Sequence, residues 1–302
     1  MSANISTAQC AAVPEQFVDL EVAFTLRATG RFARLNRLKA LITRHDATNF
    51  PTPVDYSIQH NCSACASAQR EFLRVHVTQQ AASHAQVNSV SSVASRAKRL
   101  YSGNRGVSPL LQTLRPYICP FELILPLVPR GSRVLDAGCG AGLFLGLLAD
   151  SGQITHGLGF DSSHSAISLA QRMTANLPDS TDISFQRLDA TAEWPGGTYD
   201  VVTLVDVLHH VPPAFQLAVL SRAIERVRVG GLLLYKDMAT RPRWMALCNR
   251  AHDLLAAREW IHYLPMSTVE RHMAANGMSQ VVSRSASRFC YAHEWALFQR
   301  LS

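Results

Sequence analysis

Long apolar runs are absent from this chain of 302 residues. No stretch approaches the roughly 18 consecutive apolar residues of a membrane-spanning helix, and no apolar signal segment follows the N-terminus. Glu15, Asp19 and Glu21 stand near that end, whereas transit peptides are poor in acids. The sequence therefore predicts a protein without membrane-spanning helices and favours a cytoplasmic location.

A disulfide framework and a metal-binding cysteine cluster are also missing. The seven cysteines are irregularly spaced, which favours a reducing compartment over a disulfide-stapled secreted fold. Cys62 and Cys65 form a lone C-x-x-C, and the nearby His60 and His76 do not complete a recognised zinc pattern. We therefore expect no metal site.

Lysine is scarce, since Lys39, Lys98 and Lys236 are the only three. Arginine supplies most of the positive charge, and its distribution is uneven. Residues 1–130 hold 14 Lys and Arg against 7 Asp and Glu, whereas residues 131–302 hold 15 of each kind. The whole net charge of +7 therefore lies in the N-terminal part, where it bears on binding partners rather than on the fold.

Residues 1–95 are expected to form a helical, partly disordered extension. "GRFARLNRLKALITRH" (residues 30–45) has the spacing of a basic amphipathic helix. Such a helix could pack on the main domain, lie on a membrane surface or contact nucleic acid, and no known nucleic-acid motif accompanies it. The serine-rich "SHAQVNSVSSVASRAKR" (residues 83–99) is typical of a linker or poorly ordered segment.

From Arg130 onward, apolar strand-like and helix-like segments alternate. Strands are predicted at residues 134–136, 154–161, 183–189, 200–207 and 232–237, and helices at 142–149, 166–175 and 213–229, the last ended by Gly230-Gly231. Ser162 and Ser163 are candidate caps of the second helix. This alternation predicts an α/β fold with a mostly parallel, doubly wound sheet, and we place this domain at residues 96–302.

The C-terminal part changes pattern. "MSTVERHMAANGM" (residues 266–278) predicts a helix with a capping box at Ser267 and Glu270 and a stop at Gly277. Strand-like runs follow at residues 279–287 and 291–299. Their short connection predicts an antiparallel hairpin.

The stretch "VLDAGCGAGLFLGLLA" (residues 134–149) carries the first functional signal. Glycines at a strand end let backbone approach a ligand, and open parallel sheets bind ligands there. Gly138, Gly140 and Gly142 are spaced G-x-G-x-G, and Leu143 stands where a dinucleotide fingerprint has its third glycine. Asp136 would repel a pyrophosphate but suits a ligand with a cationic end, such as the ammonium and sulfonium of S-adenosylmethionine (SAM).

Further acids follow the next strands. Asp161, about 20 residues past the glycines, is placed to accept two ribose hydroxyls, although NAD enzymes use the same device. Asp189 ends the third strand, where it could receive an adenine amino group. Asp206 ends the fourth strand, at the expected level of the methionine group.

The motifs "VLDAGCGAG", "GFDSS", "RLDA", "YDVVTLVDVLHHVPP" and "VGGLLLYKDM" stand in the order found in class I SAM-dependent methyltransferases, which residues 130–240 resemble. In style the chain is similar to the small-molecule methyltransferases of ubiquinone, menaquinone and lipid tailoring. The resemblance implies a seven-stranded Rossmann-like sheet of order 3-2-1-4-5-7-6 with strand 7 antiparallel. It also implies that SAM is bound by Asp136, Gly138, Gly140, Gly142, Asp161, Ser162, Asp189, Ala190 and Asp206.

The acceptor is expected over the ends of the fourth and fifth strands. His209 is one candidate base, because its ordinary pKa suits proton transfer near neutral pH. Asp237 is the alternative, and it should point to the opposite face of its strand from Lys236. The segment 241–265, rich in aromatic residues, could be either core or a wall for an aromatic, quinone-like, polyketide or lipid-like acceptor. The candidate acceptor contacts are His210, Lys236, Trp244, His262 and Tyr263.

Two other functions stay open on the sequence alone. The basic N-terminal part could serve a methyltransferase that acts on RNA or protein, but "DVLHHVPP" is not the motif of amino-directed nucleic-acid enzymes. A non-catalytic SAM-binding protein is the third possibility, against which the intact glycine loop and acids weigh. The sequence leaves the methylated atom and the oligomeric state open.

Overall fold

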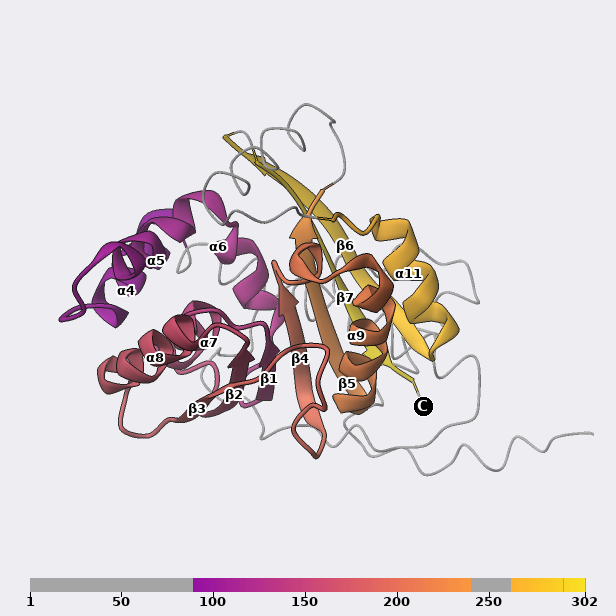
Figure 1. Ribbon diagram of the computed structural model, residues 1–302, viewed down its shortest axis with the longest axis horizontal. Coiled ribbons are helices and arrows are strands. Elements are labelled where there is room, and N and C mark those ends of the chain that lie inside the picture. Colours follow the sequence, from indigo (N-terminus) through magenta and orange to yellow (C-terminus); the bar gives the residue numbers. More distant parts are fainter. Residues whose placement is uncertain (1–88, 240–261, 290, 302) are drawn as a thin grey trace, which may run out of the picture. The chain divides into compact units, whose positions relative to one another are not determined.

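The structure is a computed structural model that describes residues 89–239, 262–289 and 291–301. They form a seven-stranded sheet of order β3-β2-β1-β4-β5-β7-β6 (Figure 1). The neighbouring strands β1 to β5 pair in parallel, and β7 runs antiparallel to both β5 and β6. The predicted fold class and strand order are confirmed. The strands are β1 (Arg133–Ala137), β2 (His156–Asp161), β3 (Asp182–Arg187), β4 (Tyr199–Val205), β5 (Val227–Met238), β6 (Met278–Arg288) and β7 (Tyr291–Arg300).

Helices cover both faces of the sheet, as the alternating apolar side chains of its central strands require. Val134, Val201 and Leu232 contribute to the core cluster that includes α4, α6, α7 and α8. Their neighbours Leu135, Val202 and Leu233 belong to the cluster with α9 and α11. The helices are α4 (Val90–Leu100), α5 (Val107–Ile118), α6 (Phe121–Ile124), α7 (Leu143–Asp150), α8 (His164–Met173), α9 (Pro213–Arg226) and α11 (Met266–Ala275), with short 3₁₀ turns η4 (Leu125–Leu127), η5 (Thr174–Asn176) and η6 (Leu208–His210).

Helix α4 corrects the prediction of a serine-rich linker at residues 83–99. Ser89 caps the helix by accepting a hydrogen bond from the backbone N–H of Ser92. Val93, Ala97 and Leu100 then follow at helical spacing and are completely buried. The serines occupy the cap and the outer face of the helix. The serine-rich composition of the segment therefore gave no indication that it is an amphipathic helix. The expected domain boundary between residues 95 and 96 falls within α4.

Two helix ends also differ from the prediction. Helix α9 ends at Arg226, and β5 already begins at Val227. Gly230 and Gly231 therefore lie inside β5 and do not end the helix; a Cβ on Gly231 would stand 2.9 Å from two backbone carbonyl oxygens. The capping box of α11 does not form, because Pro265 occupies the N-cap position.

The remaining C-terminal predictions hold. Gly277 has φ of +75° directly after α11, a backbone conformation that favours glycine and stops a helix. β6 and β7 form the predicted antiparallel hairpin. Among the described helices, none has both the length and the apolar character needed to cross a membrane.

Candidate active site

Polar residues from four strands meet where the parallel strands end. β1 supplies Asp136, β2 supplies Asp161, and the turn after β4 supplies Asp206. β5, the next strand in the sheet, brings Lys236 and Asp237 to the same edge. Because ligands of open α/β sheets bind beyond these carboxyl ends, this edge is the candidate site.

The three loop glycines have different surroundings, although all have positive φ. A Cβ on Gly138 would lie 2.6 Å from a methyl group of Val207, and one on Gly142 would lie 2.6 Å from the ring of Phe185. A Cβ on Gly140 would meet only the Arg115 guanidinium, at 3.8 Å. Gly138 and Gly142 therefore allow the loop to pack, whereas Gly140 leaves open space beside the loop.

Asp136 is buried beneath this loop, with only 2% of its surface exposed. Its Oδ1 accepts a hydrogen bond of 2.6 Å from the Thr203 hydroxyl. Burial raises the pKa of Asp136 to about 7, although that hydrogen bond and the Arg115 guanidinium favour the charged form. A cationic ligand beside Asp136 would stabilise its carboxylate further.

Asp161 joins the glycine loop to the start of α8. One carboxylate oxygen accepts the Gly140 N–H at 2.9 Å, and the other accepts the Ser163 N–H at 2.8 Å. The capping residue itself is Ser163, whose hydroxyl accepts the Ala166 N–H. Asp161 thus holds Gly140 in place, and each of its oxygens keeps a lone pair for another donor.

Asp189 lies beyond β3 in a local turn. One of its oxygens accepts both the backbone N–H and the hydroxyl of Thr191, and these bonds lower the pKa of Asp189. The neighbouring Ala190 carbonyl accepts a hydrogen bond from the Trp194 indole. The Trp194 ring packs edge-on against Phe160, with centroids 4.9 Å apart.

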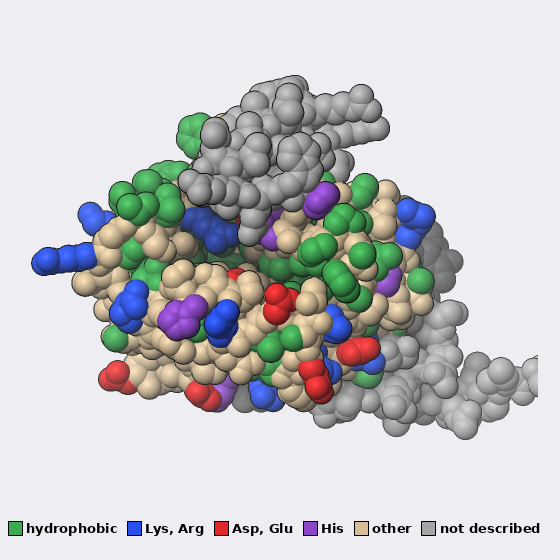
Figure 2. Space-filling model, in the orientation of Figure 1, with side chains coloured by type: hydrophobic (Ala, Val, Ile, Leu, Met, Phe, Trp, Pro, Cys, Tyr) green, Lys and Arg blue, Asp and Glu red, His purple; other side chains and the backbone are tan. Residues whose placement is uncertain are grey.

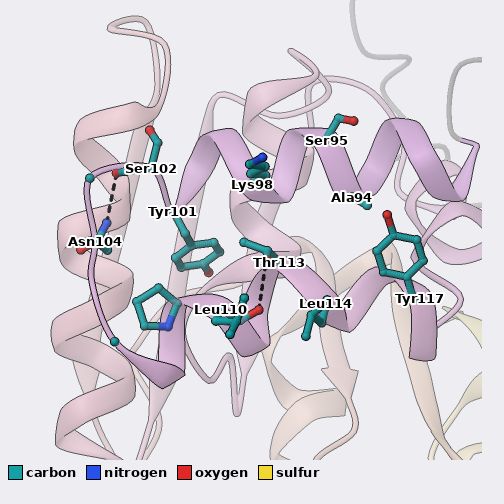
Figure 3. Close-up of a pocket in the computed structure, with 13 residues that line it drawn as sticks. Ala94, Ser95, Lys98, Tyr101, Ser102, Asn104, Leu110, Thr113, Leu114 and Tyr117 are labelled. Atoms are coloured by element: carbon teal, nitrogen blue, oxygen red, sulfur yellow. Dashed lines mark hydrogen bonds between the residues drawn. The ribbon is translucent and has the colours of Figure 1, made fainter.

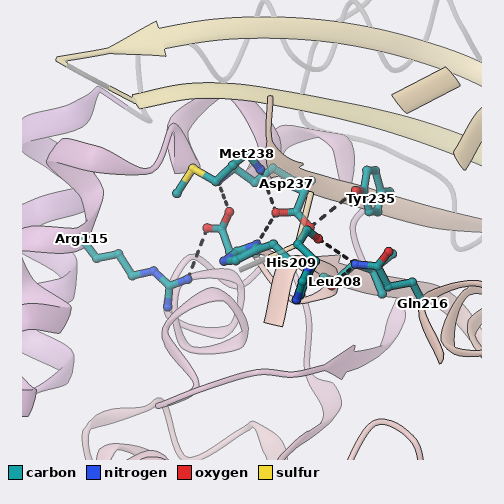
Figure 4. A network of polar contacts seen from close by, with 10 residues as sticks. Arg115, Leu208, His209, Gln216, Tyr235, Asp237 and Met238 are labelled. Carbon is teal, nitrogen blue, oxygen red and sulfur yellow. Dashed lines mark hydrogen bonds and ion pairs between the residues drawn. The ribbon is translucent and has the colours of Figure 1, made fainter. Parts of the chain in front are cut away.

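A buried ion network connects Asp206 to two cations (Figure 4). The Lys236 ammonium contacts one Asp206 oxygen, and the Arg115 guanidinium lies 3.3 Å from the other. Burial would raise the pKa of Asp206, but the two cations lower it well below its ordinary value. Asp206 has φ of +59°, a backbone conformation that residues other than glycine seldom adopt. Arg115 lies on α5, 91 residues before its partner, so sequence motifs gave no signal for it.

A second network lies on the other side of β5. The His209 Nδ1 and the Asp237 Oδ1 form a hydrogen bond between side chains that are each 3% exposed. The Met238 N–H donates to the same Asp237 oxygen at 2.8 Å, and Tyr235 lies beside the other oxygen in Figure 4. The sequence presented His209 and Asp237 as alternative bases, whereas the structure makes them partners. Lys236 and Asp237 point to opposite faces, as predicted.

The other acceptor candidates surround His209 only in part. The His210 ring lies 4.1 Å from the His209 ring, and the Tyr263 ring lies 6.4 Å away. The His262 N–H donates to the His209 carbonyl at 2.9 Å. Trp244 and most of the segment 241–265 lie outside the described residues, as do the C-x-x-C and the basic helix predicted at 30–45.

Glu294 is a neighbour of this network that the sequence analysis missed. It lies opposite Asp237 in the pairing of β5 with β7. Burial, followed by the nearby Asp237 and Glu270 carboxylates, raises the pKa of Glu294 to about 7. Only strand register brings it there, so no local motif could have indicated it.

Comparison with known proteins agrees with this arrangement. A family described as a methyltransferase domain matches residues 112–283. A ubiquinone biosynthesis O-methyltransferase of Neisseria meningitidis serogroup C is 29% identical over 142 residues, which cover 46% of this chain and 56% of that protein. One of Albidiferax ferrireducens is 28% identical over 168 residues, covering 54% and 59%. The chain thus spans about half the length of these curated relatives.

Solved structures show the same fold. Magnesium protoporphyrin IX methyltransferase from Synechocystis PCC 6803 with bound SAH aligns with a TM-score of 0.52 and 21% identity, covering 72% of this chain and 97% of that one. Its complex with SAM gives a TM-score of 0.50 and 20% identity, covering 77% and 97%. The family match extends over more than half of the chain, and the sheet order is the one expected for the class. The protein belongs to the methyltransferase-domain family of class I SAM-dependent methyltransferases.

Proposed function

We propose that this enzyme methylates a small-molecule acceptor that carries an ionisable hydroxyl, of an aromatic, quinone-like or lipid-like kind. The hydrogen bond between His209 and Asp237 carries this proposal. A hydroxyl is a poor nucleophile until its proton leaves, so its methylation benefits from a positioned base. An acceptor that has no proton to lose would need no histidine-carboxylate pair.

The residues at the strand ends fit SAM, which supplies an electrophilic methyl group when bound. The open space at Gly140 permits close approach to the loop backbone. The Asp136 carboxyl suits an ammonium group, and the Arg115 guanidinium beside Gly140 suits a carboxylate. We assign Asp161 and Ser162 to the ribose and Asp189 and Ala190 to the adenine.

His209 is the proposed base. Its Nδ1–H donates to Asp237, which leaves Nε2 as the atom that takes the proton from the acceptor hydroxyl. Asp237 then holds the ring in that tautomer and stabilises the imidazolium that forms. Exclusion of water from this buried pair strengthens the interaction.

Lys236 receives a different role from the one first expected. It is completely buried and in contact with Asp206. We therefore propose that Lys236 holds the turn after β4 and does not contact the acceptor. His210, His262 and Tyr263 remain proposed acceptor contacts, and Trp244 remains a prediction from sequence.

Kinetics of single variants test this function. The full chain is assayed with methyl-labelled SAM on a panel of phenols, hydroquinones and fatty alcohols. His209→Ala and Asp237→Asn should each lower the rate by about 10²–10⁴-fold with little change in SAM affinity by titration calorimetry. His272→Ala is the matched control, because His272 bonds to Ser221 between α9 and α11.

The pH profile separates a base from a residue that only shapes the pocket. The wild-type rate should rise with pH as the base loses its proton and then level, and His209→Ala should lose that limb. If His209→Ala kept both a near-normal rate and this profile, the assignment would be wrong.

Three further proposals concern the whole chain. We place the start of the catalytic domain at α4, because that helix packs into the core, close to the expected boundary at residue 96. The basic segment 30–45 is proposed to contact a membrane surface, and a liposome assay after its deletion tests this. A cytoplasmic location is proposed from the sequence and is testable by fractionation.

A further inference from the structure

Helix α5 exposes an apolar stripe. The exposed fractions are 71% for Val107, 57% for Leu110, 56% for Leu111 and 46% for Leu114, and Tyr117 continues the row. Their spacing puts them on adjoining positions of one helical surface. Figure 2 shows hydrophobic side chains gathered at the end of the molecule where Figure 1 places α5. Soluble proteins seldom leave such a row exposed without a binding function.

The same helix borders a hollow. Between α4 and α5 lies a cavity of about 560 Å³, into which Leu110, Leu114 and Tyr117 project beside Lys98 (Figure 3). Its lining combines apolar side chains with hydroxyls and a single ammonium group. The surface is therefore amphipathic, with apolar side chains beside one cation.

The charge of this region has one sign. Residues 89–121 contain five Lys and Arg and no Asp or Glu. Arg96 and Arg99 pair with Asp150, and Arg115 pairs with Asp206. Within the described part of the chain, no acid forms an ion pair with Lys98 or Arg105, which flank the stripe. Two cations thus remain for an external anion.

We propose that α5 and the adjoining part of α4 dock on an anionic lipid surface. Leu110, Leu111 and Leu114 would enter the boundary between headgroups and acyl chains, and Lys98 and Arg105 would face the lipid phosphates. An apolar row flanked by basic side chains is the pattern of helices that lie in a membrane interface. A symmetric contact with a second copy fits less well, because it would bring the same cations together.

Docking would place the reaction next to the bilayer. Arg115 lies one turn after Leu111 on α5, and it reaches Asp206 and lies beside Gly140. A lipid-like acceptor dissolved in the membrane could then enter the site without crossing water. This consequence rests on the proposed function, whereas docking itself does not, and the two are measured separately.

Vesicle flotation of the full chain, without SAM or acceptor, tests the proposal. Vesicles of phosphatidylcholine alone are compared with vesicles that also contain phosphatidylglycerol. Leu110→Gln combined with Leu111→Gln should weaken binding to the anionic vesicles by about tenfold or more. The matched control is Phe215→Gln with Leu217→Gln on α9, where the exposed fractions are 49% and 42%.

A second pair of variants tests the charges. Lys98→Gln with Arg105→Gln should weaken binding to anionic vesicles by about tenfold or more, since each basic group near the surface contributes about 1 kcal/mol. Arg130→Gln with Arg284→Gln changes the net charge equally at two exposed arginines elsewhere and should change binding far less. Circular dichroism and SAM titration confirm that each variant is folded.

Three outcomes would overturn the proposal. Lipid docking would be refuted if the wild-type protein did not bind anionic vesicles. If the leucine variant bound anionic vesicles as tightly as the wild type, another segment, such as residues 30–45, would make the contact. Self-association that is lost in the leucine variant, without vesicle binding, would identify the stripe as an interface between copies. Methyl transfer to soluble acceptors is assayed separately from vesicle binding. A failure of the proposed function can therefore be distinguished from a failure of lipid docking.

Discussion

The glycine loop offers a prediction in which packing and ligand approach can be separated. Gly142 has φ of +80°, and a Cβ there would lie 2.6 Å and 2.7 Å from two atoms of the Phe185 ring and 3.1 Å from the Ala170 Cβ. Gly152 has φ of +61°, and a Cβ there would meet nothing within 4 Å. Gly142→Ala therefore suffers both backbone strain and a clash, whereas Gly152→Ala suffers strain alone.

The magnitudes follow from these two terms. A left-handed backbone costs an L-residue about 1–2 kcal/mol, which is the whole expected loss for Gly152→Ala. Forcing one methyl group into a packed core adds about 1–3 kcal/mol, because the Phe185 ring cannot move without disturbing β3. We therefore expect Gly142→Ala to lower the free energy of unfolding by about 2–5 kcal/mol.

Gly140→Ala should behave in the opposite way. Its φ of +54° carries the same strain, but only Arg115 lies within 4 Å of the added Cβ. We expect a stability loss like that of Gly152→Ala, together with SAM affinity weakened by about tenfold or more. Gly142→Ala should weaken SAM binding less than Gly140→Ala when both are measured well below their unfolding temperatures.

Urea unfolding of the full chain and titration calorimetry with SAM provide the measurements. Equal m-values for the variants would show that only native stability has changed. A loss in Gly142→Ala no larger than that in Gly152→Ala would refute the packing argument. Normal SAM affinity in Gly140→Ala would show that this glycine serves the turn and not the ligand.

Three other predictions concern acids and a histidine. Because the pKa of Asp136 is raised to about 7, SAM affinity should fall as pH drops from about 8 to about 6, and Asp136→Asn should remove most of that dependence in calorimetry. Burial lowers the pKa of His293 to about 3, so the unfolded chain takes up a proton below about pH 6.5 that the folded chain refuses. The contribution of His293 to the free energy of unfolding should therefore be constant above that pH and fall by about 3 kcal/mol between pH 7 and pH 4. In urea titrations, His293→Gln should reduce this dependence of stability on pH. Asp161→Ala should weaken SAM binding by about 1–3 kcal/mol, and unchanged affinity would restrict Asp161 to holding Gly140 and Ser163.

The sheet and its acids could be predicted because their signals are local. Each acid lies at or just beyond the end of a strand, and the strand-helix alternation places those ends on one edge. Arg115 could not be found in this way, because only the packing of α5 over the glycine loop brings it to Asp206. Helix α4 was missed for a different reason, because its three serines give it the composition of a linker although four of its apolar residues are buried.

The pairing of His209 with Asp237 shows what strand register adds to sequence motifs. β4 and β5 pair with Val205 opposite Lys236, and the Asp206 N–H donates to the Lys236 carbonyl. Each motif pointed to its own residue, but only this register puts the histidine after β4 beside the carboxylate on β5. The sequence therefore identified both residues but presented them as alternative bases.

Register also explains how one strand serves two networks. Successive side chains of a strand point to opposite faces, so Lys236 reaches Asp206 and Asp237 reaches His209. A slip of β5 by one residue would exchange these faces and bring the Asp237 carboxylate toward Asp206, where two buried like charges repel. It would also place the Lys236 ammonium near His209, where it would oppose the imidazolium that a base must form. The order Lys236-Asp237 therefore suits the observed register of β5, in which Lys236 pairs with Asp206 and Asp237 pairs with His209.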